Sequence, residues 1–257
     1  MIDWSAINPQ SLAGRLLRLP AHALPRGAVM RIRHGPAKGM KWIAGSSLHG
    51  CWLGTYELDK QRALARFVRP GMAVYDIGAQ AGFYTLFFSR MAGEAGRVFA
   101  FEPCPRESGY LVEHVRINRL ANVRVVAAAV SEKPELLGMS IERGVCRNYL
   151  CDPAETMLLT PTVSLDALNF PPPNVIKMDV EGAESVVLRG AQRMLNEARP
   201  VVFVALHGEE QREMCVATLK AAGYSMYGLG GQPIDGRPSV DEIYAVPNDG
   251  DPIGQNL

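Results

Sequence analysis

Several features are missing from the sequence. It has no run of about 20 apolar residues, the length that a helix needs to cross a bilayer. Its first residues show no basic segment followed by an apolar run, so we expect no signal peptide. The net charge is only +1, which argues against a general nucleic-acid binder because such proteins carry a basic excess. We therefore expect a cytoplasmic protein with no membrane span and no nucleic-acid partner.

Cysteine is scarce as well. The five cysteines are Cys51, Cys104, Cys146, Cys151 and Cys215. Their number is odd, and no two of them form the CxxC pair that zinc sites commonly use. We expect reduced thiols, as in most cytoplasmic proteins, and no metal site.

The patterning that is present divides the chain into three regions. Residues 1–50 predict a helix over Ser11–Leu19 and a β-hairpin of residues 29–33 and 40–43, which together form an appendage. Residues 51–257 predict the main domain, because strands and helices alternate as in a parallel α/β sheet. Within it, residues 136–161 lack clear periodicity, and we expect an insertion or lid there.

The elements of the main domain follow from apolar periodicity. Strands are expected at residues 74–77, 97–101, 123–130, 174–178 and 200–206, and helices at about 83–91, 106–118, 183–198 and 211–222. The strand at 200–206 is apolar throughout, which suits burial on both faces. Two weaker strands, at residues 224–228 and 242–246, suit an antiparallel pair that closes the sheet.

A glycine-rich turn, Gly78-x-x-x-Gly82, follows the first of these strands. Doubly wound folds hold a nucleotide at such a turn, and glycine lets the backbone approach the ligand closely. Glu102 follows the second strand, where a carboxylate can accept both hydroxyls of a ribose. The pattern therefore predicts a nucleotide-like cofactor.

Two cofactor classes share this geometry. Dinucleotides require G-x-G-x-x-G, which places a pyrophosphate at the helix N-terminus, and the third glycine is missing here. Asp76, directly before the turn, would repel a pyrophosphate, whereas its charge suits the ammonium and sulfonium groups of S-adenosylmethionine. The residues favour S-adenosylmethionine over a nicotinamide cofactor. The simplest alternative is a plain turn in which Asp76 caps the helix.

A second group of polar residues lies at the carboxyl ends of later strands. Asp179 ends the fourth strand, Glu181 lies just beyond it, and His207 ends the fifth, so we expect them to converge at the ligand-binding edge. Methyl transfer to a hydroxyl needs alignment of the acceptor and a base, and His207 has the best suited pKa. Asp179 could also act as base or orient the acceptor. Alternatives are a helix-entry cap or a divalent-ion site.

Further cofactor contacts are expected around these two groups. Glu57, before the first strand, could reach the amino-acid end of the cofactor. The remaining candidate positions for cofactor binding are Ala79, Gln80, Tyr84, Thr85, Pro103, Asn118 and Ala128.

Four runs carry a resemblance to a known family. They are VYDIGAQAGFYT at 74–85, VFAFEPCP at 98–105, SLDAL at 164–168 and IKMDVEGAESVVLRG at 176–190. With these runs in this order, the sequence resembles the FkbM family of methyltransferases over roughly residues 50–225. The resemblance implies the class I methyltransferase fold, a mostly parallel seven-stranded sheet whose last pair is antiparallel. It also implies S-adenosylmethionine as donor, typically O-methylation of a small molecule or sugar, and a cofactor pocket containing Asp76, Gly78, Gly82, Glu102 and Asp179.

Two departures from the family pattern affect the candidate site. Gln80 stands where the family usually has Asn, so its contacts with the turn or the cofactor must differ. Ala205 stands where relatives often have a carboxylate two residues before the histidine. If that carboxylate orients the histidine, His207 is less well supported as a base. These departures leave a non-catalytic relative that binds cofactor as an alternative. A nicotinamide-dependent oxidoreductase is the other alternative, and the missing third glycine argues against it.

Overall fold

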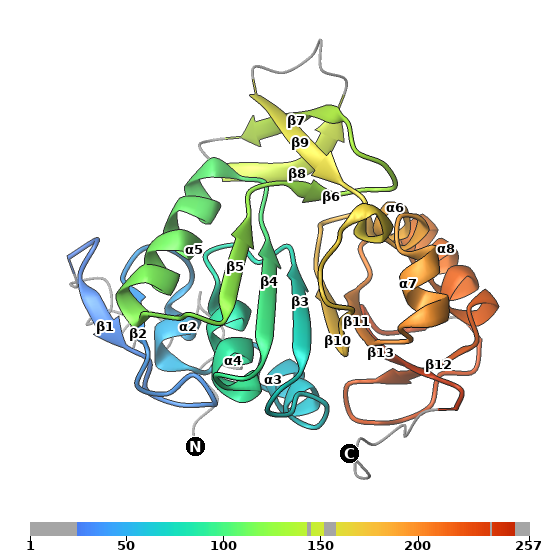
Figure 1. Ribbon diagram of the computed structural model, residues 1–257, viewed down its shortest axis with the longest axis horizontal. Coiled ribbons are helices and arrows are strands. Elements are labelled where there is room, and N and C mark those ends of the chain that lie inside the picture. Colours follow the sequence, from blue (N-terminus) through green and yellow to red (C-terminus); the bar gives the residue numbers. More distant parts are fainter. Residues whose placement is uncertain (1–24, 143–144, 152–157, 237, 250–257) are drawn as a thin grey trace, which may run out of the picture.

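A seven-stranded sheet forms the centre of the protein (Figure 1). The computed structural model describes residues 25–142, 145–151, 158–236 and 238–249, without the side chains of 140–142 and 145–151. The strand order is β12-β13-β11-β10-β3-β4-β5, and β13 is antiparallel to both its neighbours, whereas the other pairs are parallel. The strands are β3 (Ala73–Ile77), β4 (Arg97–Phe101), β5 (Val123–Val126), β10 (Val175–Met178), β11 (Val201–Ala205), β12 (Tyr224–Gly228) and β13 (Glu242–Pro247). The predicted fold class is confirmed.

Helices cover both faces of this sheet (Figure 1). They are α2 (His49–Leu53), α3 (Leu58–Ala65), α4 (Phe83–Ala92), α5 (Pro105–Asn118), α6 (Glu184–Arg189), α7 (Gln192–Glu197) and α8 (Glu209–Ala221), with a short 3-10 helix at Leu165–Ala167. The helix predicted over Ser11–Leu19 lies outside the described residues. No helix in the described part of the chain is long and apolar enough to cross a bilayer.

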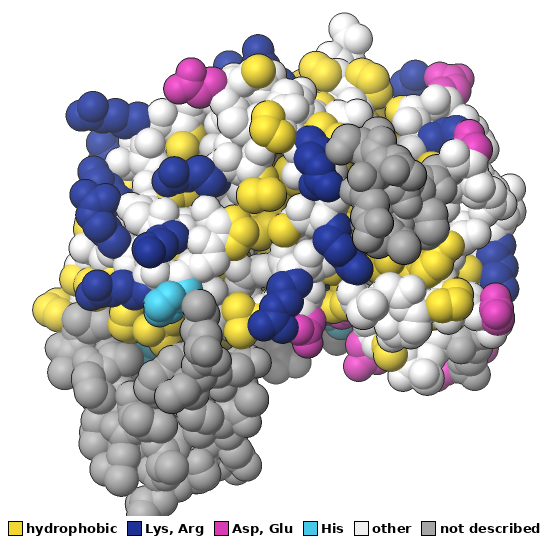
Figure 2. All heavy atoms as spheres, turned by 90° about the horizontal axis from the view of Figure 1, so that it is seen from below, with side chains coloured by type: hydrophobic (Ala, Val, Ile, Leu, Met, Phe, Trp, Pro, Cys, Tyr) yellow, Lys and Arg dark blue, Asp and Glu magenta, His cyan; other side chains and the backbone are white. Residues whose placement is uncertain are grey.

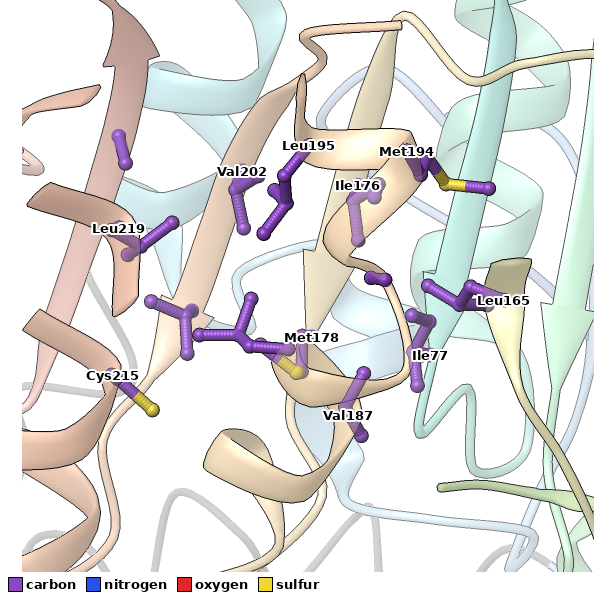
Figure 3. Packing of buried hydrophobic residues seen from close by; sticks show 14 of the residues in the cluster. Ile77, Leu165, Ile176, Met178, Val187, Met194, Leu195, Val202, Cys215 and Leu219 are labelled. Atoms are coloured by element: carbon purple, nitrogen blue, oxygen red, sulfur yellow. The ribbon is translucent and has the colours of Figure 1, made fainter. Parts of the chain in front are cut away.

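Neighbouring residues of each central strand belong to different apolar layers. On β10, Ile176 packs in the cluster that contains Leu195 and Leu219 of the later helices (Figure 3), whereas Val175 belongs to the cluster of Phe87. Because both faces are covered, the strands show continuous apolar runs instead of alternation. Parallel pairing places the carboxyl ends of β3, β4, β10 and β11 at one edge of the sheet.

The predicted hairpin is present and packs on α5. Strands β1 (Val29–Arg31) and β2 (Lys41–Ile43) pair antiparallel, and Trp42 stacks on His114 with ring centroids 4.0 Å apart. Asn118, at the last residue of α5, accepts a hydrogen bond from the Lys41 N–H (2.7 Å) and donates one to its carbonyl (2.8 Å). Asn118 therefore fastens the hairpin, and the structure does not bring it to the other candidate cofactor residues.

A second sheet of four strands stands beyond the carboxyl ends of the central strands (Figure 1). Its strands are β6 (Ala129–Val130), β7 (Leu136–Glu142), β8 (Val145–Cys151) and β9 (Leu158–Val163), in the order β6-β9-β7-β8. The single strand expected at 123–130 is thus wrong. It divides after Val126, because β5 pairs with β4 whereas β6 pairs with β9. The described residues between 136 and 161 belong to strands, although the sequence showed no periodicity there, and the role of this segment as a lid stays a prediction.

The single helix expected at 183–198 is also wrong, because it divides at Gly190 into α6 and α7. The Gly190 carbonyl leaves the helical pattern and accepts a hydrogen bond from the Asp166 N–H (2.9 Å). The carboxylate of Asp166 in turn accepts the N–H groups of Arg193 (2.7 Å) and Met194 (2.9 Å), in the first turn of α7. A side chain distant in sequence therefore caps the second helix.

Three cysteines have described side chains. Cys51 and Cys215 are buried free thiols, as expected. Cys104 is disulfide-bonded, so the expectation of reduced thiols is wrong for this residue.

Basic side chains gather on the face that is opposite the carboxyl ends of the central strands (Figure 2). Arg97 donates to the carbonyl of Gly96 (2.8 Å), and Arg124 donates to the carbonyl of Ala121 (3.0 Å), beyond the ends of α4 and α5. Cations near helix C-termini are favoured by the free carbonyls and the helix dipole. These arginines therefore have a structural explanation.

Candidate functional site

The glycine turn connects β3 to α4 and lies against the end of β10. Gly78 and Gly82 have φ of +71° and +93°. A Cβ on Gly78 would lie 1.8 Å from the Asp179 carbonyl oxygen, so only glycine permits this close approach. Gln80 also adopts a left-handed φ of +49°. Asn takes this conformation more readily than most residues, which suits the usual Asn at this position. Gln80 therefore adopts it at a local energetic cost.

Asp76 lies beneath the turn and is fully buried. Its Oδ2 accepts a hydrogen bond from the Thr85 hydroxyl (2.6 Å), and its Oδ1 lies 3.3 Å from Nζ of Lys177. Lys177 also donates to the Gly78 carbonyl (2.8 Å). Both Asp76 and Thr85 were expected to contact the cofactor, but the structure gives them partners within the protein. Their geometry supports the turn, and sequence reasoning missed Lys177 as the cation that neutralises Asp76.

Glu102 is the carboxylate that follows β4, and only 2% of its surface is exposed. Its two oxygens accept the N–H groups of Gln80 (2.7 Å) and Cys104 (2.8 Å). Burial raises the pKa of Glu102 to about 7, in spite of these two hydrogen bonds. Each carboxylate oxygen retains a further acceptor position, which fits the paired hydroxyls of a ribose.

Two hollows open on either side of Gly78, which lines both. The first contains polar and charged groups from Gln80, Lys177 and Asp179. The second is lined mainly by apolar residues, among them Phe101, Pro103, Ala128 and Val180. The first hollow offers charged groups that suit an amino-acid end, and the second offers apolar walls that suit a flat ring system. The candidate residues Ala79, Gln80, Tyr84 and Asp179 line the first hollow, and Pro103 and Ala128 line the second.

Glu57 stands at the start of α3 and faces Tyr84. Its Oε2 accepts a hydrogen bond from the Tyr84 hydroxyl (2.8 Å) and lies 2.8 Å from Nζ of Lys60. This oxygen therefore already has two partners, so the expected contact of Glu57 with the cofactor stays a prediction. Lys60, a buried lysine on α3, also lies 3.6 Å from Oδ2 of Asp179.

His207 follows β11 and has a carboxylate partner that the sequence did not reveal. Its Nδ1–H donates to Oε1 of Glu184 (2.7 Å), a fully buried residue that begins α6. The same oxygen accepts the Gly182 N–H (3.0 Å). Glu184 raises the pKa of His207 to about 8. The carboxylate absent at Ala205 is thus supplied from a helix. The sequence shows an acidic residue in the 176–190 run, but not that it is buried or that it faces His207.

The predicted convergence at the rim is present in the structure. Nε2 of His207 lies 3.8 Å from Oδ1 of Asp179 and 3.7 Å from Oε2 of Glu181. The side chains of His207 and Glu181 are 36% and 51% exposed, so both are open to an incoming molecule. The possible ligand atoms of Asp179, Glu181 and His207 all lie within 4.8 Å of one another, a spacing that also admits a divalent ion. Such clusters are common without an ion, and the expectation of no metal stays a prediction.

Fold and site together define a class I S-adenosylmethionine-dependent methyltransferase, because the nucleotide turn, Glu102 and the two hollows occupy the ligand-binding edge of this sheet. Residues 76–226 match the Methyltransferase FkbM domain, which is more than half of the chain. The protein therefore belongs to the FkbM methyltransferase family, as the resemblance implied. S-adenosylmethionine is its methyl donor, and the nicotinamide alternative falls away.

Two solved structures are similar to this chain at low identity. The FkbM methyltransferase of Methylobacillus flagellatus KT is 18% identical with a TM-score of 0.50, and the match covers 68% of this chain and 43% of that one. A SAM-dependent O-methyltransferase of Thermotoga maritima is 13% identical with a TM-score of 0.49, covering 86% of this chain and 78% of that one. The chain thus spans less than half the length of the first of these relatives. Comparison with curated proteins gives no match.

Proposed function

We propose that the protein methylates a hydroxyl group on a small molecule or sugar. The observation that carries this proposal is the His207–Glu184 pair, with the unbonded Nε2 of His207 directed to the open rim. A hydroxyl is a weak nucleophile until a base accepts its proton, whereas a neutral amine already has a free electron pair. An oriented base therefore favours O-methylation over N-methylation.

The two hollows and the position of Glu102 at the end of β4 support the cofactor contacts of this proposal. Glu102 holds the ribose hydroxyls, while Pro103 and Ala128 line the space for the adenine ring. Asp179, in the charged hollow, faces the ammonium group of the amino-acid end. When bound, S-adenosylmethionine supplies an electrophilic methyl group, and these residues fix the direction from which an acceptor can approach it.

Proton transfer follows from the contacts of His207. Nδ1–H is bonded to Glu184, so the neutral ring presents the lone pair of Nε2 to the acceptor hydroxyl. After the proton moves to Nε2, the carboxylate of Glu184 stabilises the imidazolium. Asp179 and Glu181, at 3.8 and 3.7 Å, add negative charge near the same nitrogen.

The experiment is a transfer assay with methyl-labelled S-adenosylmethionine and a panel of sugars and hydroxylated small molecules. His207→Ala should lower turnover by about 10² to 10⁴, the usual contribution of a general base. His34→Ala, which alters an exposed histidine outside the site, is the control and should match the wild type. Transfer to amines alone, or normal turnover in His207→Ala, would contradict the proposal.

A further inference from the structure

Lys60 is a buried cation that the scheme above does not use. Its side chain is 5% exposed and lies among carboxylates from three separate parts of the chain. Nζ is 2.8 Å from Oε2 of Glu57 and 3.6 Å from Oδ2 of Asp179, and it also contacts Oε1 of Glu242, the first residue of β13. A buried lysine is costly unless it is paired, so this arrangement calls for an explanation.

The two oxygens of Asp179 have different neighbours. Oδ2 lies toward Lys60, whereas Oδ1 lies toward Nε2 of His207. Since Asp179 also lines the charged hollow beside Gly78, its orientation affects both the cofactor side and the acceptor side. We propose that Lys60 is a positioning residue, which keeps Asp179 ionised and oriented for binding the cationic end of the cofactor. This inference rests on the proposed role of Asp179.

The charges around Asp179 show why a cation is needed at this position. Cations near it are Lys60 from α3, Lys177 from β10 and His207 after β11, and carboxylates near it are Glu57, Glu181 and Glu242. Tyr56 also faces it. Burial alone would raise the pKa of Asp179, but Lys177, Lys60 and His207 hold it below its usual value. The pKa of Glu242 is raised by burial, so the cluster already has little room for further negative charge.

Removing Lys60 would leave Asp179, Glu57 and Glu242 with no shared cation. Carboxylates that share a buried site cannot all stay ionised, so at least one pKa must rise. Protonation of Asp179 would remove the negative charge that faces the ammonium of S-adenosylmethionine. Cofactor affinity should then depend on pH on the acid side, which a purely structural lysine would not cause.

The test is a calorimetric titration with S-adenosylmethionine at several pH values between about 5.5 and 8. In Lys60→Met, affinity should fall about tenfold more than in the wild type from the upper to the lower pH, which corresponds to a rise of about three units in the pKa of Asp179, within the range of buried carboxyl groups. Arg62→Met is the matched control, because Arg62 lies on the same helix but is 74% exposed in a surface pair with Asp59. It should behave as the wild type does.

A double variant serves as a control for misfolding of Lys60→Met. Lys60→Met/Glu242→Gln removes one charge of each sign, and it should keep an acid-side loss that is smaller than in Lys60→Met. Glu242→Gln alone keeps Lys60 and should show no acid-side loss beyond that of the wild type. A wild-type pH dependence in both Lys60→Met variants would overturn the role of Lys60. A wild type that binds no S-adenosylmethionine would instead overturn the proposed cofactor site.

Discussion

The glycine turn and the rim of Asp179, Glu181 and His207 lie side by side at one edge of the sheet, yet their polar groups have different surroundings. In the turn, Asp76 and Glu102 are almost fully buried and are bonded to Thr85 and backbone N–H groups. At the rim, Glu181 and His207 are partly exposed, and the carboxylate oxygens of Glu181 and Asp179 lie 3.7 and 3.8 Å from Nε2 of His207.

This difference suggests that the turn serves to hold the backbone and the cofactor, whereas the rim serves the reaction. A buried carboxylate that is bonded within the protein holds the backbone in place, whereas an exposed and oriented group is available to a substrate. We therefore expect changes in the turn to affect stability and cofactor affinity, and changes at the rim to affect turnover. The predictions below test this separation, from the largest expected effect to the smallest.

Asp76→Ala should cause the largest loss, and the loss should be in stability. The change leaves Lys177 as a buried cation without its carboxylate, which costs about 3–5 kcal/mol in comparable cases. Urea unfolding followed by circular dichroism measures it. Asp59→Ala, in an exposed pair with Arg62, is the control and should change stability by about 1 kcal/mol or less. A stable Asp76→Ala protein that has lost cofactor affinity would show that Asp76 touches the cofactor instead.

Glu184→Gln should lower turnover by about a hundredfold, because the base loses the group that orients it and stabilises its charged form. It should also change the pH profile. In the wild type kcat/KM should rise with pH through about 8, since only neutral His207 accepts a proton. Without Glu184 the pKa of His207 should fall toward 6.5, so the rise should move to lower pH. An unmoved profile would mean that another group is the base.

Glu102→Gln should weaken cofactor binding by about tenfold, because an amide forms weaker hydrogen bonds to ribose hydroxyls than a carboxylate does. Calorimetry with S-adenosylhomocysteine measures this. Its effect on turnover at saturating cofactor should be small. A large loss of turnover at saturation would place Glu102 in the reaction and break the separation of the two regions.

Glu132→Gln should have the smallest effect. Glu132 forms an ion pair with Arg189 (2.9 Å) whose side chains are 54% and 45% exposed. Exposed pairs of this kind contribute about 0–1 kcal/mol. Thermal unfolding and turnover should both match the wild type, and a clear loss of turnover would extend the functional region beyond the rim.

The sequence predicts elements well where the pattern is local. The apolar run of β11 and the hairpin of β1 and β2 were both placed correctly. Prediction from the sequence fails where a contact with a distant part of the chain determines where an element ends. The break at Gly190 depends on Asp166, and the end of β5 at Val126 depends on which sheet the next strand joins.

The candidate site follows the same rule. The residue types at the turn and at the rim indicated a methyl donor, and the convergence of Asp179, Glu181 and His207 is present. The partners that determine how these groups act come from other elements. Glu184 and Lys60 lie on helices whose periodicity gave no sign of a polar contact, so only the folded chain reveals them.

The most direct test of the account compares the wild type with His207→Ala in a calorimetric titration with S-adenosylhomocysteine. The account predicts saturable binding to both proteins, with dissociation constants within about threefold of each other, less than 1 kcal/mol. No binding to the wild type would contradict the cofactor site. A loss of affinity in His207→Ala as large as that in Glu102→Gln would contradict the proposal that the turn binds the cofactor and the rim acts in the reaction.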